Sequence, residues 1–463
     1  MFAETSGFSY GWRKVGNQTH RASSHRNLTI LLMALVSATL IFFARAAVAS
    51  TETVLHTFTS KSGLTFSGVV IDKAGNLYGT TFDGGTFGKG TVYQLSLAKT
   101  GKWTYSVIHN FANDGRDGTG PGGANLVLDS NGNLYGSTNY GGSGKGCKSP
   151  GCGTVFKLTR NGKSWTETIL YSFQGGKDGS FPQNLAFDSQ GILYSTTGAG
   201  GKGPCSNQQS TGCGTVFKLS PSSKGIWTKT TLYSFQGLSE GQYPVYGVVL
   251  DSAGNLYGVT VDGGFGASTC TVNGYVGCGT VFALMHSGKT WTHSVLYSFV
   301  AGHDGQWPSG PLVFDKQGNL YGMTDAGGGS HGGRTVICNL GCGTVFELSP
   351  AGGGTWTESV IHSFSGDEGA TCQGGVIFDN TGNLYGTAQL GGAYGDGTVF
   401  KLRYSGTTWL VTVLHSFQYA PTDGADPENG VIFDNAGNLY STTLLGGIGN
   451  PNSVQGTVFK IAP

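Results

Sequence analysis

Charged residues are scarce in this chain. They make up 11% of its 463 residues, and 27 Lys and Arg nearly balance 26 Asp and Glu. A chain this close to neutrality offers no basic surface for nucleic acid. Long helical periodicity is also missing, because glycine interrupts each run before it reaches the length of a helix. The sequence therefore predicts an all-β protein with many short strands and no nucleic-acid partner.

Glycine is abundant, with 82 residues, but the chain is not low in complexity. Its 38% hydrophobic and 12% aromatic content is too high for disorder. The glycines instead recur at fixed positions of a unit first seen at residues 68–95, GVVIDKAGNLYGTTFDGGTFGKGTVYQL. Its Asp returns at Asp72, Asp129, Asp188, Asp251, Asp315, Asp379 and Asp434, and its Gly-Thr-Val-aromatic strand begins at Gly90, Gly153, Gly214, Gly279, Gly343, Gly397 and Gly456. Seven copies predict an array in which each copy buries its apolar face against its neighbours.

Each copy is expected to hold four strands. In the first copy these cover residues 68–72, 76–81, 90–95 and 103–111, and the first is expected to be innermost and buried on both faces. The Asp-x-x-Gly-Asn segment between the first two strands predicts a tight hairpin. A calcium loop is the less favoured interpretation, because each copy supplies one carboxylate where calcium needs several converging oxygens.

The order of the strands indicates how the array ends. Residues 50–58 match the fourth strand of residues 165–173, with Ser50 in the Trp position, and residues 456–461 form a third strand. The last unit is complete only if the N-terminal strand pairs beside the C-terminal one. The prediction is a seven-bladed β-propeller of four-stranded blades, closed by pairing of the N-terminal strand with the C-terminal blade. An open, capped β-solenoid is the alternative.

The first 49 residues differ in kind from the repeats. Basic residues lead into an uncharged, mainly apolar run at residues 28–44, followed by the small residues Ala47-Val48-Ala49. This pattern predicts a secretory signal peptide at residues 1–49, ahead of a propeller at residues 50–463. An uncleaved membrane anchor is the alternative. Cleavage would leave an exported, slightly acidic protein outside the membrane, in the periplasm, at the cell surface or in the medium.

The motif Gly-Asn-Leu-Tyr-Gly-x-Thr-x-x-Gly-Gly, followed by Gly-Thr-Val-Phe-Lys-Leu, resembles the GloVer (Gloeo-Verruco) tandem repeat of secreted bacterial proteins of the choice-of-anchor type. The resemblance covers the whole chain after the leader. It implies an exported repeat protein without assigned catalytic residues. Relatives often carry a C-terminal anchoring tail, and this sequence stops at Ile461-Ala462-Pro463, so free secretion is the favoured expectation.

Eight of nine cysteines fall in pairs, each pair within one second-to-third-strand loop: Cys147 with Cys152, Cys205 with Cys213, Cys270 with Cys278, and Cys338 with Cys342. In an exported protein this spacing predicts four local disulfides, with Cys372 left over. Zinc binding by the pairs is the less favoured alternative, because each pair would need two further ligands.

One position of the fourth strand holds His56, His109, His362 or His415 in four copies and tyrosine in the other three. A position that accepts His or Tyr indicates packing with a polar tip. The sequence shows no catalytic constellation. It therefore predicts no catalytic residue, no metal site and no cofactor.

A candidate ligand site comes from the connections between the fourth strand of one copy and the first strand of the next. Most contain an acid, then Gly, then Pro three residues later, and three consecutive copies place an aromatic before the Pro. The candidate ligand-binding residues are Phe181, Tyr243 and Trp307, with Asp178, Glu240 and Asp304 nearby. Aromatic faces beside carboxylates suit sugars and other amphipathic ligands. The competing interpretation is that Asp-Gly sets a turn and the aromatic covers the edge of the core.

The favoured function is a secreted, non-enzymatic binding propeller for a glycan, an envelope component or a protein. An alternative is a propeller lyase or hydrolase with its active site on one face of the disc, which the fold alone does not exclude. A structural surface or matrix protein is a third possibility. Inward-pointing polar residues in the central channel would favour the enzyme, and a shallow aromatic groove would favour the binder.

Overall fold

The computed structural model describes residues 50–122, 124–148, 150–206, 211–265, 270–272, 275–329, 332–420, 422–448 and 454–462. The chain divides into two compact units, Met1–Ala49 and Ser50–Pro463. The predicted signal peptide lies outside the described residues. In the part of the chain that is described, no helix has the length and apolar character needed to cross a membrane.

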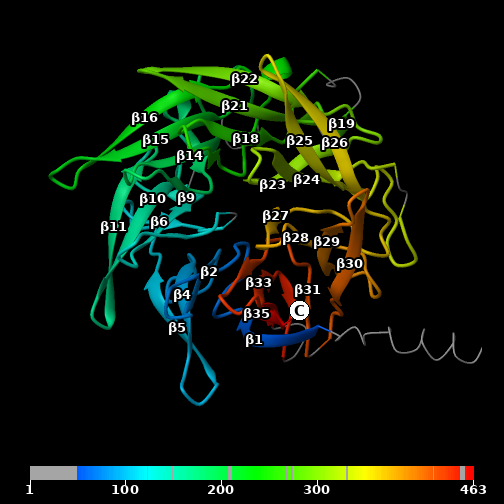
Figure 1. Cartoon of the computed structure of the whole chain (residues 1–463). Coiled ribbons are helices and arrows are strands. Elements are labelled where there is room, and N and C mark those ends of the chain that lie inside the picture. Colours follow the sequence, from blue (N-terminus) through cyan, green and yellow to red (C-terminus); the bar gives the residue numbers. More distant parts are fainter. Residues whose placement is uncertain are drawn as a thin grey trace, which may run out of the picture. The chain divides into compact units, whose positions relative to one another are not determined.

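The unit that begins at Ser50 contains seven antiparallel four-stranded blades, arranged in a ring (Figure 1). The fold is the predicted seven-bladed β-propeller, and the described residues form no α-helix, only the 3-10 turns η1 (Gly176–Asp178) and η2 (Leu238–Glu240). From the innermost strand outward, blade 1 has β2 (Val70–Ile71), β3 (Leu77–Thr81), β4 (Thr91–Leu97) and β5 (Trp103–Asn110); blade 2 has β7 (Val127–Leu128), β8 (Leu134–Thr138), β10 (Thr154–Asn161) and β11 (Ser164–Ser172); blade 3 has β13 (Ala186–Phe187), β14 (Leu193–Ala199), β15 (Thr215–Pro221) and β16 (Trp227–Ser234), with β12 (Ser180–Pro182) also paired to β14.

The remaining blades repeat this order. Blade 4 has β17 (Val249–Leu250), β18 (Leu256–Thr260), β21 (Thr280–Ser287) and β22 (Thr290–Ser298); blade 5 has β23 (Gln306–Phe314), β24 (Leu320–Ala326), β25 (Thr344–Gly352) and β26 (Thr355–Ser363); blade 6 has β27 (Val376–Phe378), β28 (Leu384–Ala388), β29 (Thr398–Tyr404) and β30 (Trp409–Ser416); blade 7 has β32 (Ile432–Phe433), β33 (Leu439–Thr443), β35 (Val454–Ala462) and β1 (Thr51–Thr59).

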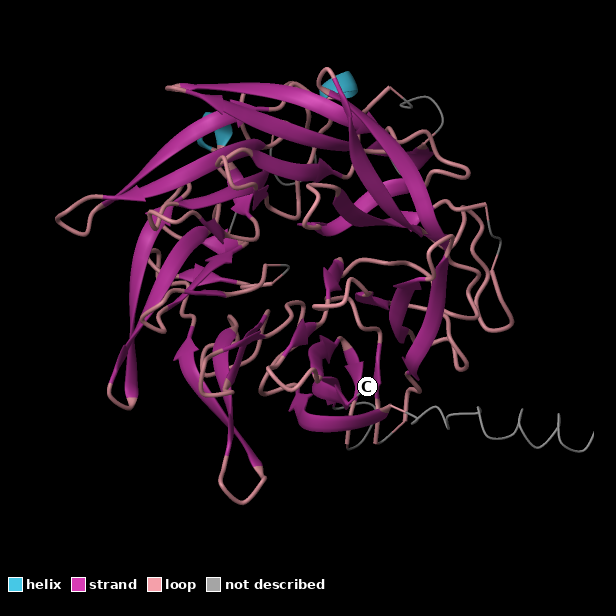
Figure 2. Ribbon diagram, in the orientation of Figure 1, coloured by secondary structure: helices cyan, strands magenta, loops and turns pink. Residues whose placement is uncertain are grey.

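Blade 7 is closed by the first strand of the unit, as predicted. β1 pairs antiparallel with β35, from Thr51 opposite Ala462 to Thr59 opposite Val454. Figures 1 and 2 show β1 along the outer edge of the C-terminal blade. The pairing joins the two ends of the array, so neither end leaves an open strand edge.

The second strand of each blade, not the first, is the fully buried one. All five residues of β3 are buried, whereas both residues of β2 are only half-buried. The expectation that the innermost strand is buried on both faces is therefore wrong. The innermost strands lie nearest the axis of the ring (Figure 1), so one side of each borders the central channel rather than another strand.

The core lies between the blades and depends on one repeated aromatic contact. The Phe that ends each outer strand is fully buried and packs against a third-strand aromatic of the next blade, with ring centroids 5.0–5.2 Å apart. The pairs are Phe58–Tyr93, Phe111–Phe156, Phe173–Phe217, Phe235–Phe282, Phe299–Phe346, Phe364–Phe400 and Phe417–Phe459. Such tilted pairs add about 0.5–1.5 kcal/mol each beyond the burial of their area. Phe58 of β1 continues the series from blade 7 to blade 1, so the closing strand also completes the core.

The Asp-x-x-Gly-Asn hairpins are held by their own carboxylates. Asp72 Oδ1 accepts the backbone N–H groups of Ala74 and Asn76, both at 2.9 Å. Its Oδ2 accepts the Asn76 amide at 2.8 Å and the Tyr78 hydroxyl at 3.0 Å. Both oxygens are thus committed to the turn, which supports the structural interpretation over a calcium loop.

The two sets of long loops lie on the same face of the ring. In blade 2, β6 (Gly118–Thr119) of the fourth-to-first connection pairs with β9 (Tyr140–Gly141) of the second-to-third loop. Blade 7 repeats the contact with β31 (Gly424–Ala425) and β34 (Leu445–Gly446). A further hairpin, β19 (Thr271–Val272) with β20 (Tyr275–Val276), stands in the second-to-third loop of blade 4.

The second-to-third loops also contain the disulfides. The four predicted bonds are present, Cys147–Cys152, Cys205–Cys213, Cys270–Cys278 and Cys338–Cys342, and Cys372 is free and buried. The loop face is therefore cross-linked in blades 2 to 5, while the face with the Asp hairpins has no disulfide among the described residues.

Candidate ligand-binding site

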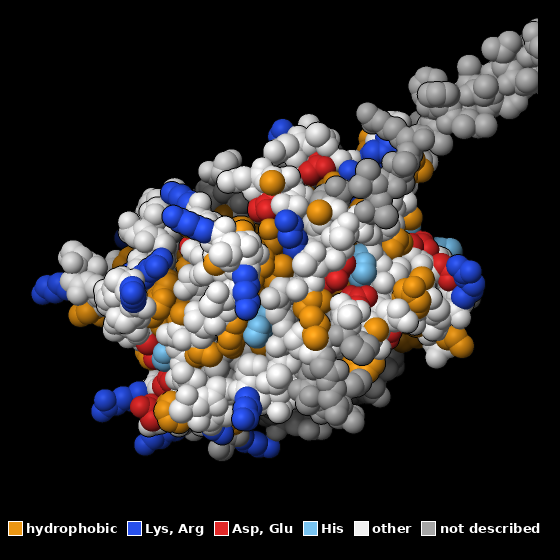
Figure 3. Space-filling model, turned by 90° about the horizontal axis from the view of Figure 1, so that it is seen from below, with side chains coloured by type: hydrophobic (Ala, Val, Ile, Leu, Met, Phe, Trp, Pro, Cys, Tyr) orange, Lys and Arg blue, Asp and Glu red, His pale blue; other side chains and the backbone are white. Residues whose placement is uncertain are grey.

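Surface charge gives little guidance to a site. On the side of the unit seen in Figure 3, the Lys, Arg, Asp and Glu side chains are dispersed, and hydrophobic side chains reach the surface between them. The features that distinguish a site are instead the geometry of the loop face, where the sequence predicts a site, and the middle of the ring.

The three candidate carboxylates are bonded to the outer strand and loop that precede them, and Asp178 also pairs with Lys229 of the next blade. Each accepts a hydrogen bond from the tyrosine that ends the outer strand and one from a backbone N–H of the loop. The pairs are Asp178 with the Tyr171 hydroxyl (2.8 Å) and Gln174 N–H (2.8 Å), Glu240 with the Tyr233 hydroxyl and Gln236 N–H, and Asp304 with the Tyr297 hydroxyl (2.9 Å) and Val300 N–H (3.1 Å). The repeat position that holds His or Tyr thus hydrogen-bonds to the loop acid in these three copies. The sequence predicted only packing at this position.

The three candidate aromatics share an unusual backbone conformation. Phe181, Tyr243 and Trp307 have φ values of 60°, 59° and 57°, and each precedes a proline. Bulky residues rarely adopt positive φ, and a strained residue that recurs at one position points to a constraint there. The constraint includes the following proline: Pro182 reaches Gly153 so closely that a Cβ on Gly153 would lie 2.7 Å from the Pro182 ring. Gly153 itself has a φ of 95°, so this strand must begin with glycine.

A cavity of about 250 Å³ lies immediately beside these loops. The fourth-to-first connections of all seven blades contribute to its lining, and residues from all seven can meet only on the axis of the ring. The cavity is therefore the mouth of the central channel. Its polar lining consists of Asn125, Asn139, Gln183, Asn184, Gln373, Glu428 and Asn429, and Phe66 and Tyr246 add aromatic walls.

None of the six predicted residues lines this cavity, but the aromatics stand close to it in the chain. Gln183 follows Phe181 by two residues, and Tyr246 follows Tyr243 by three. A series of ring contacts also leads outward from the cavity: Phe66 to Phe82 at 5.4 Å, Phe82 to Tyr140 at 6.4 Å, and Tyr140 to Phe181 at 5.6 Å. Phe181 is thereby connected to the channel wall.

Two asparagines fix one side of the channel. Asn125 Oδ1 accepts the backbone N–H of Gly68 in blade 1 at 2.7 Å, and Asn184 Oδ1 accepts the backbone N–H of Asn125 at 2.6 Å. The Asn184 amide in turn donates to the carbonyl of Tyr246 at 3.3 Å. Four consecutive blades are linked in this way, so this wall of the cavity is held rigidly.

The other side of the channel is acidic. Gln373 Nε2 donates to Asp325 at 3.4 Å and to Gln389 at 3.2 Å, and Gln389 Nε2 donates to Glu428 at 3.0 Å. Burial raises the pKa of Asp325 to about 6, against the hydrogen bond from Gln373. Burial, together with Asp426 and Asp325, raises the pKa of Glu428 to about 7. Glu428 thus lines the channel mouth, and Asp325 lies behind it on the lining residue Gln373, each with a raised pKa.

Tyr246 faces both acids. Burial first, then Asp325 and Glu428, raise the pKa of its hydroxyl, so the phenol stays protonated. Its hydroxyl makes no hydrogen bond within the described residues, whereas its backbone carbonyl is bonded to Asn184. It is therefore a free donor in the channel mouth.

Sequence reasoning missed these channel residues because, apart from Asn125 and Asn184, which both stand four residues before the hairpin Asp, they do not repeat. Between the X-Pro pair and the inner strand, the copies differ in length and composition: Gln183-Asn184 follows Pro182 directly, whereas Val245-Tyr246-Gly247 follows Pro244. The signal available was this break in the repeat, since positions freed from packing are the ones that can vary.

The fold is similar to those of several solved structures. The similar solved structures include a Bacteroides uniformis protein with a suggested 6-phosphogluconolactonase activity (14% identity, 80% of this chain and 88% of that chain, TM-score 0.47) and a Bacteroides fragilis protein of the same description (13%, 86% and 89%, 0.46). A gluconolactonase from Xanthomonas campestris is similar at 14% identity over 73% of this chain and 88% of that chain, with a TM-score of 0.39. Comparison with curated proteins finds no match.

The repeat itself identifies the family. The family profile of the Gloeobacter/Verrucomicrobia repeat matches residues 39–272, 151–339 and 338–463, which together span all seven blades. This agrees with the resemblance seen in the Gly-Asn-Leu-Tyr and Gly-Thr-Val-Phe motifs. The chain belongs to the Gloeobacter/Verrucomicrobia repeat family.

Proposed function

We propose that this protein is an exported binding propeller that holds a saccharide, or another ligand rich in hydroxyl groups, at the mouth of its central channel. The observation that carries the proposal is the cavity lined by amides, the Glu428 carboxyl and two aromatics. Fixed amide donors and acceptors beside aromatic faces suit sugar hydroxyls and sugar ring faces. Four disulfides support export, because such bonds persist in oxidising compartments.

Phe181, Tyr243 and Trp307 would form the outer rim of the same site. A terminal sugar would occupy the channel mouth, and the rim aromatics would stack on units further along a chain. Asp178, Glu240 and Asp304 were predicted to orient the ligand; in this proposal their hydrogen bonds to Tyr171, Tyr233 and Tyr297 hold the loops that carry the rim.

The test is calorimetric titration of the chain from Ser50 with oligosaccharides selected on a glycan array. Tyr246→Phe removes the hydroxyl donor, and Glu428→Gln replaces one acceptor oxygen by an amide NH2; each should weaken binding about ten-fold. Lys316→Ala, in an exposed Asp hairpin, is the matched control and should bind normally. Saccharide binding unaffected by both channel variants would refute the site.

The rim has its own test. Trp307→Ala should weaken binding of longer oligosaccharides while the melting temperature stays nearly unchanged, because Trp307 is only half-buried and its exposed part contributes to recognition more than to the core. A large loss of stability with intact binding would show that Trp307 covers the core edge instead.

A propeller hydrolase or lyase is the second candidate, favoured by Asp325 and Glu428. Carboxyl groups that titrate near neutrality can serve as general acid and base. In that case the chain should cleave a bound saccharide, and Asp325→Asn and Glu428→Gln should each abolish turnover. Binding without product release over long incubation would favour the binder.

A further inference from the structure

A second kind of polar site lies in the seams between neighbouring blades, away from the channel. Three residues meet in several of these seams: the His or Tyr near the end of one outer strand, the loop acid that follows it, and the residue two positions after the Trp position of the next blade's outer strand. We call this set the inter-blade cluster. It forms because the loop acid turns back onto its own outer strand, beside the strand of the next blade.

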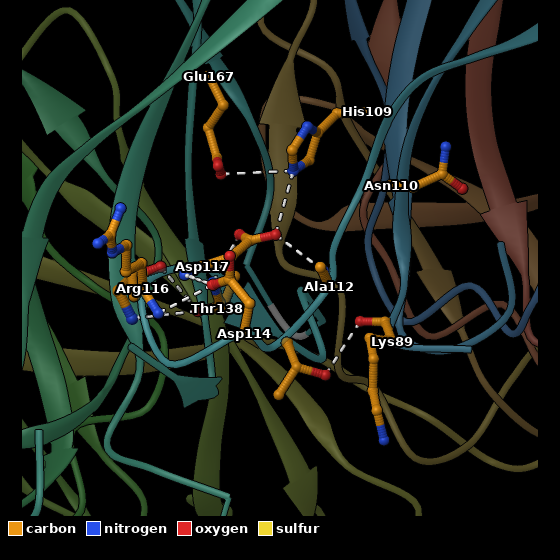
Figure 4. Close-up of polar contacts among 12 residues, drawn as sticks. Lys89, His109, Asn110, Ala112, Asp114, Arg116, Asp117, Thr138 and Glu167 are labelled. Atoms are coloured by element: carbon orange, nitrogen blue, oxygen red, sulfur yellow. Dashed lines mark hydrogen bonds and ion pairs between the residues drawn. The ribbon is translucent and has the colours of Figure 1, made fainter. Parts of the chain in front are cut away.

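The cluster between blades 1 and 2 consists of His109, Asp117 and Glu167. His109 Nε2 lies 3.7 Å from Asp117 Oδ2 and 3.5 Å from Glu167 Oε1. Figure 4 shows the imidazole placed between the two carboxylates. His109 Nε2 and Glu167 Oε1 are buried and lack a hydrogen bond of good geometry. Three ligand-type atoms therefore converge on one point without satisfying one another.

The same set of side chains recurs between blades 6 and 7. His415 Nε2 lies 3.1 Å from both oxygens of Asp423, and Glu52 of the closing strand β1 completes the cluster. In both clusters the three ligand atoms lie within 4.8 Å of one another. The buried Glu52 Oε1 also lacks a hydrogen-bond partner among the described residues.

The seam between blades 2 and 3 shows what this position accommodates. In this seam Lys229 takes the place that Glu167 has between blades 1 and 2. Its Nζ lies 3.0 Å from Asp178 Oδ1, and its side chain is almost fully buried. The ammonium also stands 5.5 Å from the centre of the Phe173 ring. The chain itself thus supplies a cation at the site where the other two seams present a second carboxylate.

Charge is unbalanced in the two seams that combine one histidine with two carboxylates. A neutral imidazole with two carboxylates leaves buried like charges facing each other, which is costly unless a proton or a cation intervenes.

We propose that these two seams bind divalent transition-metal ions of the zinc type, one through His109, Asp117 and Glu167 and one through His415, Asp423 and Glu52. Zinc takes imidazole and carboxylate ligands at about 2.0–2.2 Å, so tetrahedral ligand atoms lie about 3.4 Å apart, close to the separations at His109. The imidazole disfavours calcium and magnesium, which select oxygen ligands. A fourth position is left for water.

Such ions would fasten neighbouring blades to each other. The site with Glu52 would join the closing strand to blade 6, so it would hold β1 in the ring. This assignment departs from the sequence-based expectation that the histidines serve only in packing. It is independent of the saccharide proposed for the channel.

The test is zinc titration of the metal-stripped chain from Ser50, by calorimetry with elemental analysis of the dialysed protein. We expect two ions per chain, one in Glu167→Gln, one in Glu52→Gln and none in the double variant. Zinc should raise the melting temperature of the wild type and not that of the double variant, because only a folded site binds the ion.

Two variants separate metal binding from folding. Glu358→Gln changes the same position in the seam of Tyr297 and Asp304, which has no histidine, and should still bind two ions. Glu167→Lys reproduces the side chain of Lys229 and should lose one ion while remaining folded. The proposal is overturned if the wild type binds no zinc after dialysis, or if the double variant and Glu167→Lys keep the wild-type stoichiometry.

Discussion

At the scale of single residues, the most repeated device is an aspartate that uses both oxygens to hold its own hairpin. In the copy with most bonds, Asp379 accepts the backbone N–H groups of Thr381 and Asn383, the Thr381 hydroxyl and the Asn383 amide, at 2.6–2.9 Å. Although burial acts to raise it, these bonds hold the pKa of Asp379 well below its usual range. The carboxylate is therefore needed in its charged form.

Asp379→Ala should lower the free energy of unfolding by about 1–3 kcal/mol at pH 7, because several donors of the turn, some of them part-buried, lose their acceptor. The folded pKa is depressed, so this contribution is present above about pH 3.8 and is lost as the pH falls further. Denaturant unfolding from pH 7 to pH 3 measures both effects. Asn380→Ala, in the same turn, is the control; equal losses in the two variants would contradict the role given to the carboxylate.

The pKa of Glu358 is shifted in the opposite direction to that of Asp379. Burial, followed by Asp304, raises its pKa to about 7. The folded state then holds a proton that the unfolded state releases above about pH 4.5, so stability should fall as the pH rises from about 4.5 to about 7. Glu358→Gln should remove that slope and raise stability at pH 8 by about 1–2 kcal/mol after solvent screening.

Unfolding midpoints of the wild type and Glu358→Gln, taken at pH 5 and pH 8, check this expectation. Ser359→Ala, an exposed neighbour on β26, should keep the wild-type slope. A wild-type chain that is more stable at pH 8 than at pH 5, with no gain from Glu358→Gln, would show that Glu358 is ionised without cost.

At the scale of elements, the second-to-third loops depend on local disulfides. Cys205 and Cys213 close a loop of eight residues. A short loop constrains the unfolded chain only modestly, so Cys205→Ala with Cys213→Ala should cost about 2 kcal/mol in unfolding free energy. Chemical denaturation measures the loss, and non-reducing peptide mapping should find four links, each within one blade. A link between cysteines of different blades would overturn the pairing.

The sequence predicts the elements well where packing fixes every copy. Three features recur at regular places in the repeat: the Asp hairpins, the Phe that ends each outer strand and the cysteine pairs. The sequence alone therefore locates each of them. The burial of the strands was predicted less well: periodicity shows that residues 68–72 are apolar, but not that one side of β2 borders the channel.

The candidate site was only partly predictable. The aromatic arc rests on a repeated X-Pro position, and the structure adds the positive φ that the three residues share. The channel residues Asn125, Tyr246 and Glu428 come from three different blades at positions that do not align, so only the closed ring brings them together. The inter-blade clusters were hidden for the same reason, because Glu167 and Glu52 belong to the blade after their histidine.

At the scale of the whole molecule, the central feature is closure of the ring by β1. This strand contributes the fourth strand of blade 7, Phe58 to the core between blades 7 and 1, and Glu52 to one proposed metal site. A channel mouth lined by all seven blades exists only if the ring is closed. Closure by β1 is therefore required for the channel mouth and for the proposed metal site that contains Glu52.

A circular permutant tests this claim most directly. The start of β1 lies opposite the end of β35, Thr51 beside Ala462, so residues 50–61 can be moved behind residue 462 through a copy of the hairpin turn at residues 161–164. Guanidinium unfolding of three chains is compared: the chain from Ser50, the permutant, and a chain that lacks residues 50–61. The account predicts one cooperative transition with nearly the same midpoint for the first two, and a much lower or broadened transition for the third. An unchanged midpoint in the chain without β1 would contradict closure of the ring by this strand.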